Sequence, residues 1–377
     1  MLKNFLFLFI FIFWYSTTIM FTTNLRNVMG VPISTVNNII DIIILLLLMI
    51  QIVFFQSYKK RELVIIIGIT IPIIIAAALS RQYSLLSGWM FIVAARNVDL
   101  DRVIRVAYKI LLIMIPAIVF LCFIGFIEDR TLTRGDIQRF SLGFVHPNHL
   151  GMRIFQLILC HFYINKNKLG MLNFFFIISA IIFVIIIPNS QTAYICLTVF
   201  LVMILGYRYF INQRQILMEI CAKCLISGYL LLNMVSIIFS YIDINKNVVL
   251  SQIDKWMSMR FSLCHKVWQL YGVSFFGQRI YISPEERKLA GITGSLWLDN
   301  AYVSMLLRYG VLVFLLFSIC YLYLMKAMTA KKKYVLVIIL FLYSLYGAME
   351  PALYMITHNI FLIAFSEILY NKCDKEI

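Results

Sequence analysis

Apolar runs long enough to cross a membrane follow one another along almost the whole chain. A spanning helix needs about 20 consecutive apolar residues, with a tolerated range of roughly 17 to 25. The chain is 62% hydrophobic and 13% charged, whereas soluble domains are about half apolar and a quarter charged. We therefore expect an all-α polytopic membrane protein with about twelve transmembrane helices and a single integral membrane domain over residues 1–377. The expected spans are 5–21, 35–55, 63–79, 83–95, 107–127, 144–163, 171–187, 191–207, 224–241, 298–325, 334–349 and 352–370.

The distribution of lysine and arginine predicts the orientation of these spans. If the N-terminus is cytoplasmic, the inner segments hold nineteen of these residues and the short outer loops hold five. Cytoplasmic loops carry such an excess in membrane proteins. The fourth segment, 83–95, is short. It must still cross the membrane if the basic loops at 59–61 and 96–105 are to lie on the same side. We expect a bacterial plasma membrane protein, multi-pass, with both termini in the cytoplasm.

The same distribution explains the formal net charge of +16 without any nucleic-acid partner. Cys221 and Cys224 form a CxxC pair, but no second pair accompanies them, so neither a metal site nor a cofactor is expected. The lipid bilayer is the first partner that the sequence predicts.

Polar clusters stand at the outer ends of helices that run inward. They are His146-Pro147-Asn148-His149, Asn189-Ser190-Gln191-Thr192, Asp299-Asn300 and Glu350-Pro351. The positive end of each helix dipole would face outward there, which favours an anion. The simpler explanation is helix capping, which we favour for Ser190 and Asp299. Capping explains the His146 cluster poorly, because histidine is not a preferred cap.

Two arginines are expected inside spans. At 1.5 Å per residue, Arg153 lies roughly 12 Å and Arg308 roughly 15 Å below the start of its helix. Charges at such depths usually face a wet cavity or a partner, and the alternative is a structural ion pair or snorkelling. His161 is expected to be structural, whereas His358 beside Asn359 is undecided.

Residues 242–297 are predicted to form a large extracytoplasmic loop. Val249, Ile253 and Trp256 recur at helical spacing, which indicates an amphipathic helix on the membrane surface. Topology does not require basic groups there, yet the loop holds Arg260, His265, Lys266 and Arg279. They could attract lipid headgroups, or an arginine could bind a diphosphate through two hydrogen bonds.

Four stretches in order resemble Wzy-type polysaccharide polymerases of the O-antigen polymerase and ligase superfamily. Residues 143–151, GFVHPNHLG, are similar to the family's G-F-x-H-P-N-x-x-G element. Ser258-Met259-Arg260 with Trp268 and Phe276-Gly277 resembles its large-loop arginine element. Leu298 to Gly310 resembles its D-N-x-Y…Y-G element, and Glu350 to Leu362 its final helix. Residues before 100 match only in hydrophobicity.

The resemblance implies a metal-independent glycosyltransferase of the membrane-embedded type, which joins undecaprenyl-diphosphate-linked repeat units of a capsule, exopolysaccharide or O-antigen. Its expected partners are the lipid-linked oligosaccharides, a flippase and a chain-length regulator. Arg260 and helix N-termini would hold the diphosphate, and the base would be His146, His265 or Asp299, with His146 preferred. The expected substrate-binding residues are Asn148, His149, Arg153, Arg279, Asn300, Arg308, Glu350 and Asn359.

Three alternatives remain at this stage. A ligase would transfer finished glycan to a different acceptor and shares the motifs. A flippase for lipid-linked oligosaccharides would also have about twelve spans, but would place charge along the whole crossing. A scaffold for capsule assembly would tolerate changes at His146 or Arg260.

Overall fold

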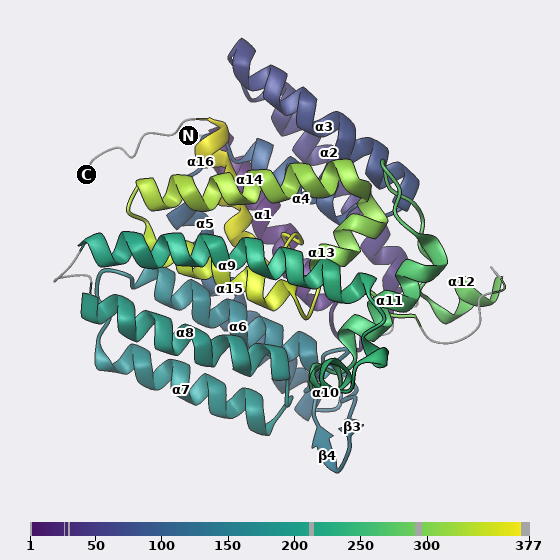
Figure 1. Cartoon of the computed structure of the whole chain (residues 1–377). Helices are drawn as coiled ribbons and strands as arrows, with labels where there is room; N and C mark the ends of the chain where they lie inside the picture. The colour runs from purple at the N-terminus through teal and green to yellow at the C-terminus, as the bar shows by residue number, and fades with distance from the viewer. Residues whose placement is uncertain are drawn as a thin grey trace. The chain divides into compact units, whose positions relative to one another are not determined.

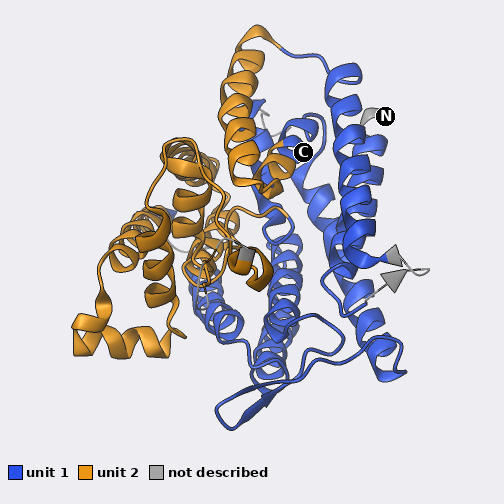
Figure 2. Ribbon diagram, turned by 90° about the vertical axis from the view of Figure 1, so that its right-hand side faces the viewer, with its two compact units in different colours: residues 1–58, 90–215, 357–377 blue, residues 59–89, 216–356 orange. Residues whose placement is uncertain are grey.

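The computed structural model describes residues 2–25, 27–28, 31–210, 215–289, 291 and 296–370. Figure 1 shows a chain built almost wholly of helices, with two short hairpins. The chain divides into two compact units, each assembled from separate stretches of sequence (Figure 2). Unit 1 is 1–58, 90–215 and 357–377, and unit 2 is 59–89 and 216–356. Each unit contains stretches from both halves of the chain. The single membrane domain over residues 1–377 stays a prediction.

Unit 1 is organised around the helix that follows the His146 motif. Its elements are α1 (Leu2–Met20), β1 (Asn27–Val28), β2 (Val31–Pro32), α2 (Ile33–Phe54), α5 (Leu100–Phe123), β3 (Leu132–Arg134), β4 (Ile137–Arg139), α6 (Pro147–Ile164), α7 (Met171–Ile186), α8 (Gln191–Phe210), η3 (Ile360–Ala364) and α16 (Phe365–Leu369). Helix α6 packs against α5, α7 and α8 and is buried on nearly every side. Gly151 allows this packing, because a Cβ there would lie 2.5 Å from the Cβ of Ser190.

Unit 2 contains the long loop and the helices on either side of it. Its elements are α3 (Lys60–Ser80), α9 (Gln215–Tyr241, from residue 216), η1 (Ile244–Lys246), α10 (Val248–Trp256), α11 (Arg260–Tyr271), α12 (Pro284–Leu289), α13 (Ala301–Ser304), the π-helical turn η2 (Met305–Tyr309), α14 (Gly310–Ala330) and α15 (Tyr334–Gly347). Helix α4 (Ser84–Ala94) runs from unit 2 into unit 1.

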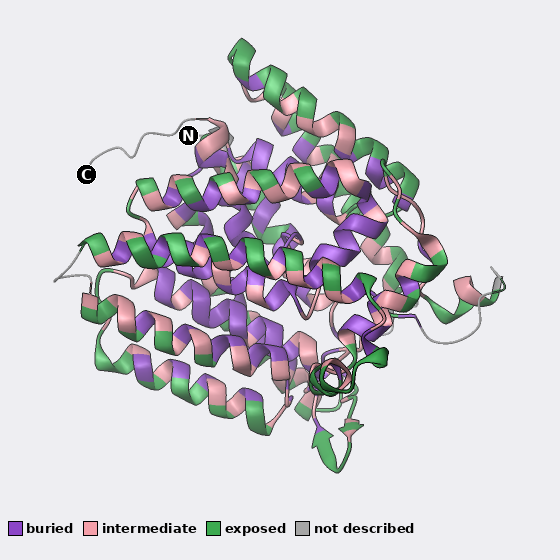
Figure 3. Ribbon diagram, viewed as in Figure 1, coloured by how far each residue is buried: buried purple, intermediate pink, exposed green. Residues whose placement is uncertain are grey.

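Six helices among the described residues are long and apolar enough to cross a membrane. They are α2, α3, α5, α8, α9 and the run Ala301–Ala330. Many of their apolar side chains stay exposed, such as Ile42, Val64 and Ile113 at 58%, 71% and 67% (Figure 3). So much exposed apolar surface is rare on a soluble protein and requires an apolar surrounding. The chain is therefore mostly helical and has the outer surface of a membrane protein.

The last expected span, 352–370, is not one helix. Turns occupy most of the chain from Pro351 to His358, and the short helices η3 and α16 follow. Pro351 lacks the N–H that a continuing helix needs. The carbonyls of Thr357 and His358 accept hydrogen bonds from side chains, described below, in place of those of a helix. The fourth expected span forms α4, which has only eleven residues and is about 16 Å long. Neither segment is among the six long apolar helices.

The amphipathic helix expected within 242–297 forms as two helices, α10 and α11. Ser258 and Met259 adopt left-handed backbone conformations, with φ of 61° and 59°, and separate them. Helix α10 leaves Val249, Ile253 and Trp256 exposed, as a helix on a membrane surface would. The loop also shares a core with the segment that follows it, in which Cys264, Val267, Ile280, Leu296, Leu298, Val303 and Leu307 pack together.

The tenth expected span is interrupted at Gly310, and the long loop closes the interruption. Gly310 has a φ of 84°, so the helical hydrogen bonding stops there. The Val311 N–H donates instead to the Ser274 carbonyl at 3.0 Å. On the other side of the break, the Arg308 carbonyl accepts from the Gln278 N–H at 2.9 Å. Backbone groups that the break leaves unpaired are thus satisfied by the segment 274–278.

Two glycines allow the loop and the broken helix to approach this closely. A Cβ on Gly310 would lie 2.6 Å from the Phe275 carbonyl oxygen, and one on Gly277 would lie 2.7 Å from the Arg308 carbonyl oxygen. Both glycines also have positive φ, which side chains disfavour. The motifs Phe276-Gly277 and Tyr309-Gly310 therefore form one structural contact.

We predict that Gly310→Ala lowers the free energy of unfolding by about 2 kcal/mol or more, through the strained φ and the clash with backbone. Thermal unfolding of the full chain in detergent measures this. Gly68→Ala is the matched control, because Gly68 lies in α3 with nothing within 4 Å of an added Cβ. That control should be neutral or slightly stabilising. Equal stability of the two variants would contradict the role of Gly310.

Candidate functional site

The predicted site residues fall into two groups, one in each unit. His146, Asn148, His149, Arg153 and Asn359 belong to unit 1. Unit 2 holds the others: Arg260, His265, Arg279, Asp299, Asn300, Arg308 and Glu350. Each group has its own set of contacts.

His146 is the N-cap of α6, contrary to the expectation that capping would not explain it. Its Nδ1 accepts the backbone N–H of Asn148 at 3.0 Å, and Pro147 occupies the first turn. A backbone N–H can only donate, so Nδ1 carries the lone pair and the hydrogen of the neutral ring is on Nε2. Nδ1, the nitrogen of the neutral ring that could take up a proton, therefore already accepts a hydrogen bond. This geometry makes His146 a poor general base.

Arg139, which ends β4, holds Asn148 in place. Its Nη2 donates to Asn148 Oδ1 at 2.5 Å, and its Nε donates to the Pro188 carbonyl at 2.9 Å. Arg139 is 4% exposed. Arg139 is one of the five basic residues expected in the short outer loops, and no other role was predicted for it. Its position seven residues before His146, on the side where few basic residues are expected, is the signal that could have identified it.

Arg153 and Gln156 bind the interrupted segment before η3. Arg153 Nη1 donates to the Thr357 carbonyl at 2.9 Å and to Gln156 Oε1 at 2.8 Å. Gln156 Nε2 donates to the carbonyls of Thr357, at 3.0 Å, and His358. Arg153 is only 1% exposed, and these bonds give it the structural role that was the alternative to substrate binding. The rings of His149 and His358 are 6.5 Å apart, and Asn359 is fully buried at the start of η3.

Arg260 opens α11, and Asp254 fixes that end of the helix. The Asp254 carboxylate accepts the backbone N–H groups of Phe261 and Ser262 at 2.9 and 3.2 Å, and also the Ser262 hydroxyl. Asp254 is 2% exposed, so this cap is buried. Charge-assisted hydrogen bonds of this kind are strong and orient the groups that they join. Asp254 is not among the site residues predicted from the sequence.

Arg260 forms an ion pair with Asp299 through Nη1 and Oδ2. The side chains are 14% and 28% exposed, so the pair lies near the surface. The Nε of Arg260 is buried and has no hydrogen-bond partner among the residues that the structure describes. Two motif elements that lie 39 residues apart in sequence thus meet here, and the guanidinium keeps one donor available.

Asn300, rather than Asp299, caps α13. Its Oδ1 accepts the N–H groups of Tyr302 and Val303 at 3.0 and 3.2 Å, and its Nδ2 donates to the Ala348 carbonyl at 2.9 Å. Glu350 lies two residues after Ala348, in the turn that follows α15. Capping was expected for Asp299, so the cap shifts by one residue, and Asp299 is left to pair with Arg260.

His265 has the opposite tautomer from His146. Its Nδ1 lies 3.1 Å from the Ser240 carbonyl, which can only accept, so Nδ1 carries the hydrogen. The lone pair of the neutral ring is then on Nε2, where it can accept a proton. His265 is partly exposed on α11. It therefore has the geometry of a general base that His146 lacks.

Arg279 and Arg308 have different surroundings. Arg279 Nη2 donates to Glu286 Oε1 at 2.7 Å, and this hydrogen bond lowers the pKa of the Glu286 carboxyl. The Arg279 guanidinium also lies 4.8 Å from the ring centre of Tyr281. Arg308 lies in the π-helical turn just before the break at Gly310, and its Nε has no hydrogen-bond partner among the described residues.

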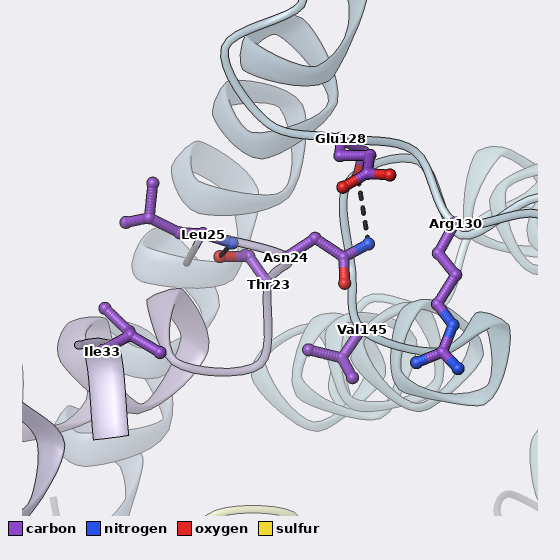
Figure 4. Close-up of a pocket in the computed structure, with 7 residues that line it drawn as sticks. All are labelled: Thr23, Asn24, Leu25, Ile33, Glu128, Arg130 and Val145. Atoms are coloured by element: carbon purple, nitrogen blue, oxygen red, sulfur yellow. Dashed lines mark hydrogen bonds between the residues drawn. The ribbon is translucent and has the colours of Figure 1, made fainter. Parts of the chain in front are cut away.

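A cavity of about 420 Å³ opens in unit 1 beside Val145, in the segment that leads into α6 (Figure 4). Glu128, Arg130 and Asn24 supply its polar lining, and Ile33 and Val145 line it with apolar groups. Asn24 Nδ2 donates to the carbonyls of Glu128 and Phe144 at 3.0 and 3.1 Å. Charged and amide groups beside apolar walls suit a polar ligand such as a sugar.

Comparison of the chain with protein-family models, with curated proteins and with solved structures finds no match.

We predict that His146→Ala lowers the free energy of unfolding by about 1 kcal/mol, because α6 loses its N-cap. His146→Asn should keep the stability, since asparagine is a good N-cap. Thermal unfolding in detergent compares the two variants. If His146→Asn is as unstable as His146→Ala, His146 does not act as a cap.

Proposed function

We propose that the protein is a Wzy-type polymerase, which joins lipid-linked oligosaccharide repeat units at the outer face of a bacterial plasma membrane. The twelve-crossing topology, with both termini cytoplasmic and residues 242–297 outside, is part of this proposal. The observation that carries it is the pairing of Arg260 with Asp299, which joins the arginine element and the D-N element of the family pattern in one place.

The reaction requires a cation for the leaving group and a base for the acceptor. The acceptor hydroxyl forms a bond to the anomeric carbon of the growing chain, and the bond from that carbon to the diphosphate oxygen breaks. Undecaprenyl diphosphate leaves as an anion, and the hydroxyl proton passes to the base. Arg260 suits the anion, because a guanidinium binds phosphate through two parallel hydrogen bonds, and its buried Nε makes no hydrogen bond to a described residue. Asp299 holds that guanidinium in place before substrate arrives.

His265 is the base in this proposal, in place of the preference for His146. Its Nε2 is oriented by the Nδ1 bond to the Ser240 carbonyl. Residues five apart on a helix are about 140° apart around its axis, so Arg260 and His265 do not share one face of α11. Arg260 is the first residue of α11, so a substrate at this end of the helix has to contact the two side chains from different directions. Asp299 is a weaker candidate, because its carboxylate is paired with Arg260.

Unit 1 has a polar cavity of its own. The cavity beside Val145 presents Asn24, Glu128 and Arg130, whose side chains could bind sugar hydroxyls. The ligase remains the alternative function, because it would use the same anion site. No observation favours a flippase or a scaffold over these two.

We predict that Arg260→Ala reduces polymer by roughly 100-fold or more, because the developing diphosphate charge loses its principal donor. Single repeat units should accumulate on undecaprenyl diphosphate outside the membrane. The measurement is gel analysis of surface polysaccharide, together with extraction of lipid-linked sugars, in cells whose only polymerase is this chain. Lys266→Ala, which removes an exposed cation from the same helix, is the control.

Three other results would each contradict a part of this proposal. Polymer of normal length in the Arg260→Ala cells removes Arg260 from the mechanism. Long lipid-linked chains that fail to reach their final acceptor identify a ligase. Single units confined to the cytoplasmic leaflet identify a flippase.

We predict that His265→Asn lowers polymer formation by roughly 100-fold or more, whereas His146→Asn leaves it nearly unchanged. The asparagine amide at 265 can still donate to the Ser240 carbonyl, so the variant should fold, but it has no group that takes up a proton. Polymer yield at equal protein level compares the two. The reverse pattern would make His146 the base.

A further inference from the structure

A groove lies between α9 and α14 on unit 2. It is near the start of α9 and the end of α14, which are the proposed cytoplasmic ends of these helices. The helices meet further along, where Asn233 Nδ2 donates to Ser318 Oγ at 3.1 Å and Tyr229 donates to the Ser318 carbonyl at 3.3 Å. Beyond that contact they enclose a space of about 610 Å³. Figure 1 shows the two helices running along the same side of unit 2.

Lysines line this groove from both helices. Lys223 extends from α9 and Lys326 from α14, and both side chains are exposed. Glu219 also lines the groove, but neither lysine lies within 4 Å of a carboxylate of any described residue. The three side chains give the groove a net charge of +1.

The remaining lining is mostly apolar, with the hydroxyl residues Ser227 and Thr329 among it. Ile226, Leu230 and Leu322 form the walls, and Leu230 is 44% exposed. A second hollow of about 570 Å³ shares Lys223 and is lined by Ile220 and Leu231. Figure 3 shows exposed surface along both helices. An apolar trough with cations at one end matches a lipid, whose acyl chains need apolar contact and whose headgroup carries a phosphate.

We propose that this groove, named here the α9–α14 groove, binds an anionic phospholipid of the inner leaflet. The phosphate lies against Lys223 and Lys326, and an acyl chain lies along Leu230 and Leu322. A lipid with one net negative charge balances the +1 of the groove, whereas a zwitterionic lipid does not. The site depends on the proposed topology, which places this end in the anionic cytoplasmic leaflet, and not on the polymerase activity.

The test is native mass spectrometry of the full-length protein released from nanodiscs of phosphatidylglycerol and phosphatidylcholine in equal amounts. The wild type should retain phosphatidylglycerol. The double variant Lys223→Ala/Lys326→Ala should bind it roughly 30-fold more weakly, since two lysines near a headgroup each contribute. The double variant Lys109→Ala/Lys168→Ala, with the same loss of charge in unit 1, is the control and should bind as the wild type does. Lys223→Arg/Lys326→Arg should retain the lipid.

Each contrary outcome overturns the proposal. Equal retention of both lipids by the wild type removes the charge preference. Equal loss in the two alanine variants shows a general effect of charge. Displacement by millimolar inorganic phosphate shows an anion site with no part for the acyl chain. Polymer assays on the same variants report separately on the proposed function, because all of these variants keep Arg260 and His265.

Discussion

Hydrocarbon offers no hydrogen-bond partner, so each interruption of a membrane helix has to be closed by the protein itself. Two interruptions in this chain are closed by distant segments. The break at Gly310 is closed by backbone groups of residues 274–278, and the segment before η3 by the side chains of Arg153 and Gln156. Some of the polar residues that stand out in the sequence, namely His146, Arg153 and Asn300, bond to backbone groups at helix starts or at such an interruption. Their role is to satisfy the backbone.

That role separates structural from chemical candidates. His146 and Asn300 cap α6 and α13, and Arg153 binds a backbone carbonyl, so hydrogen bonds within the chain account for the positions of these three residues. Arg260 and His265 keep a donor and a lone pair, respectively, that the described residues do not use. Asp254, by capping α11, holds both of them in position. In the proposed function the chemistry is therefore concentrated on one short helix of the long loop.

The sequence predicted the helices well, because runs of apolar residues and basic loops depend only on local composition. Helices occur at nearly all of the expected positions, from α1 to α15. It failed for 352–370, where hydrogen bonds from α6, some 200 residues earlier, replace a helix. It also missed Arg139 and Asp254, whose importance lies in which distant backbone groups they reach. The preference for His146 came from its position beside the expected anion site, whereas the tautomer that argues against it depends on which backbone group each ring faces.

The motif at the start of α6 and the arginine of α11 can serve one extracytoplasmic reaction only if they face the same compartment. Cysteine labelling with a membrane-impermeant maleimide on intact cells tests this directly, in a variant without native cysteines. Single cysteines at Gln138, before α6, and at Lys266, on α11, are both exposed positions, and Lys168 is an exposed position on the proposed inner side. The proposed topology predicts that cysteines at 138 and 266 react on intact cells and that one at 168 reacts only after permeabilisation. Reaction of 138 and 266 from opposite sides of the membrane would contradict it.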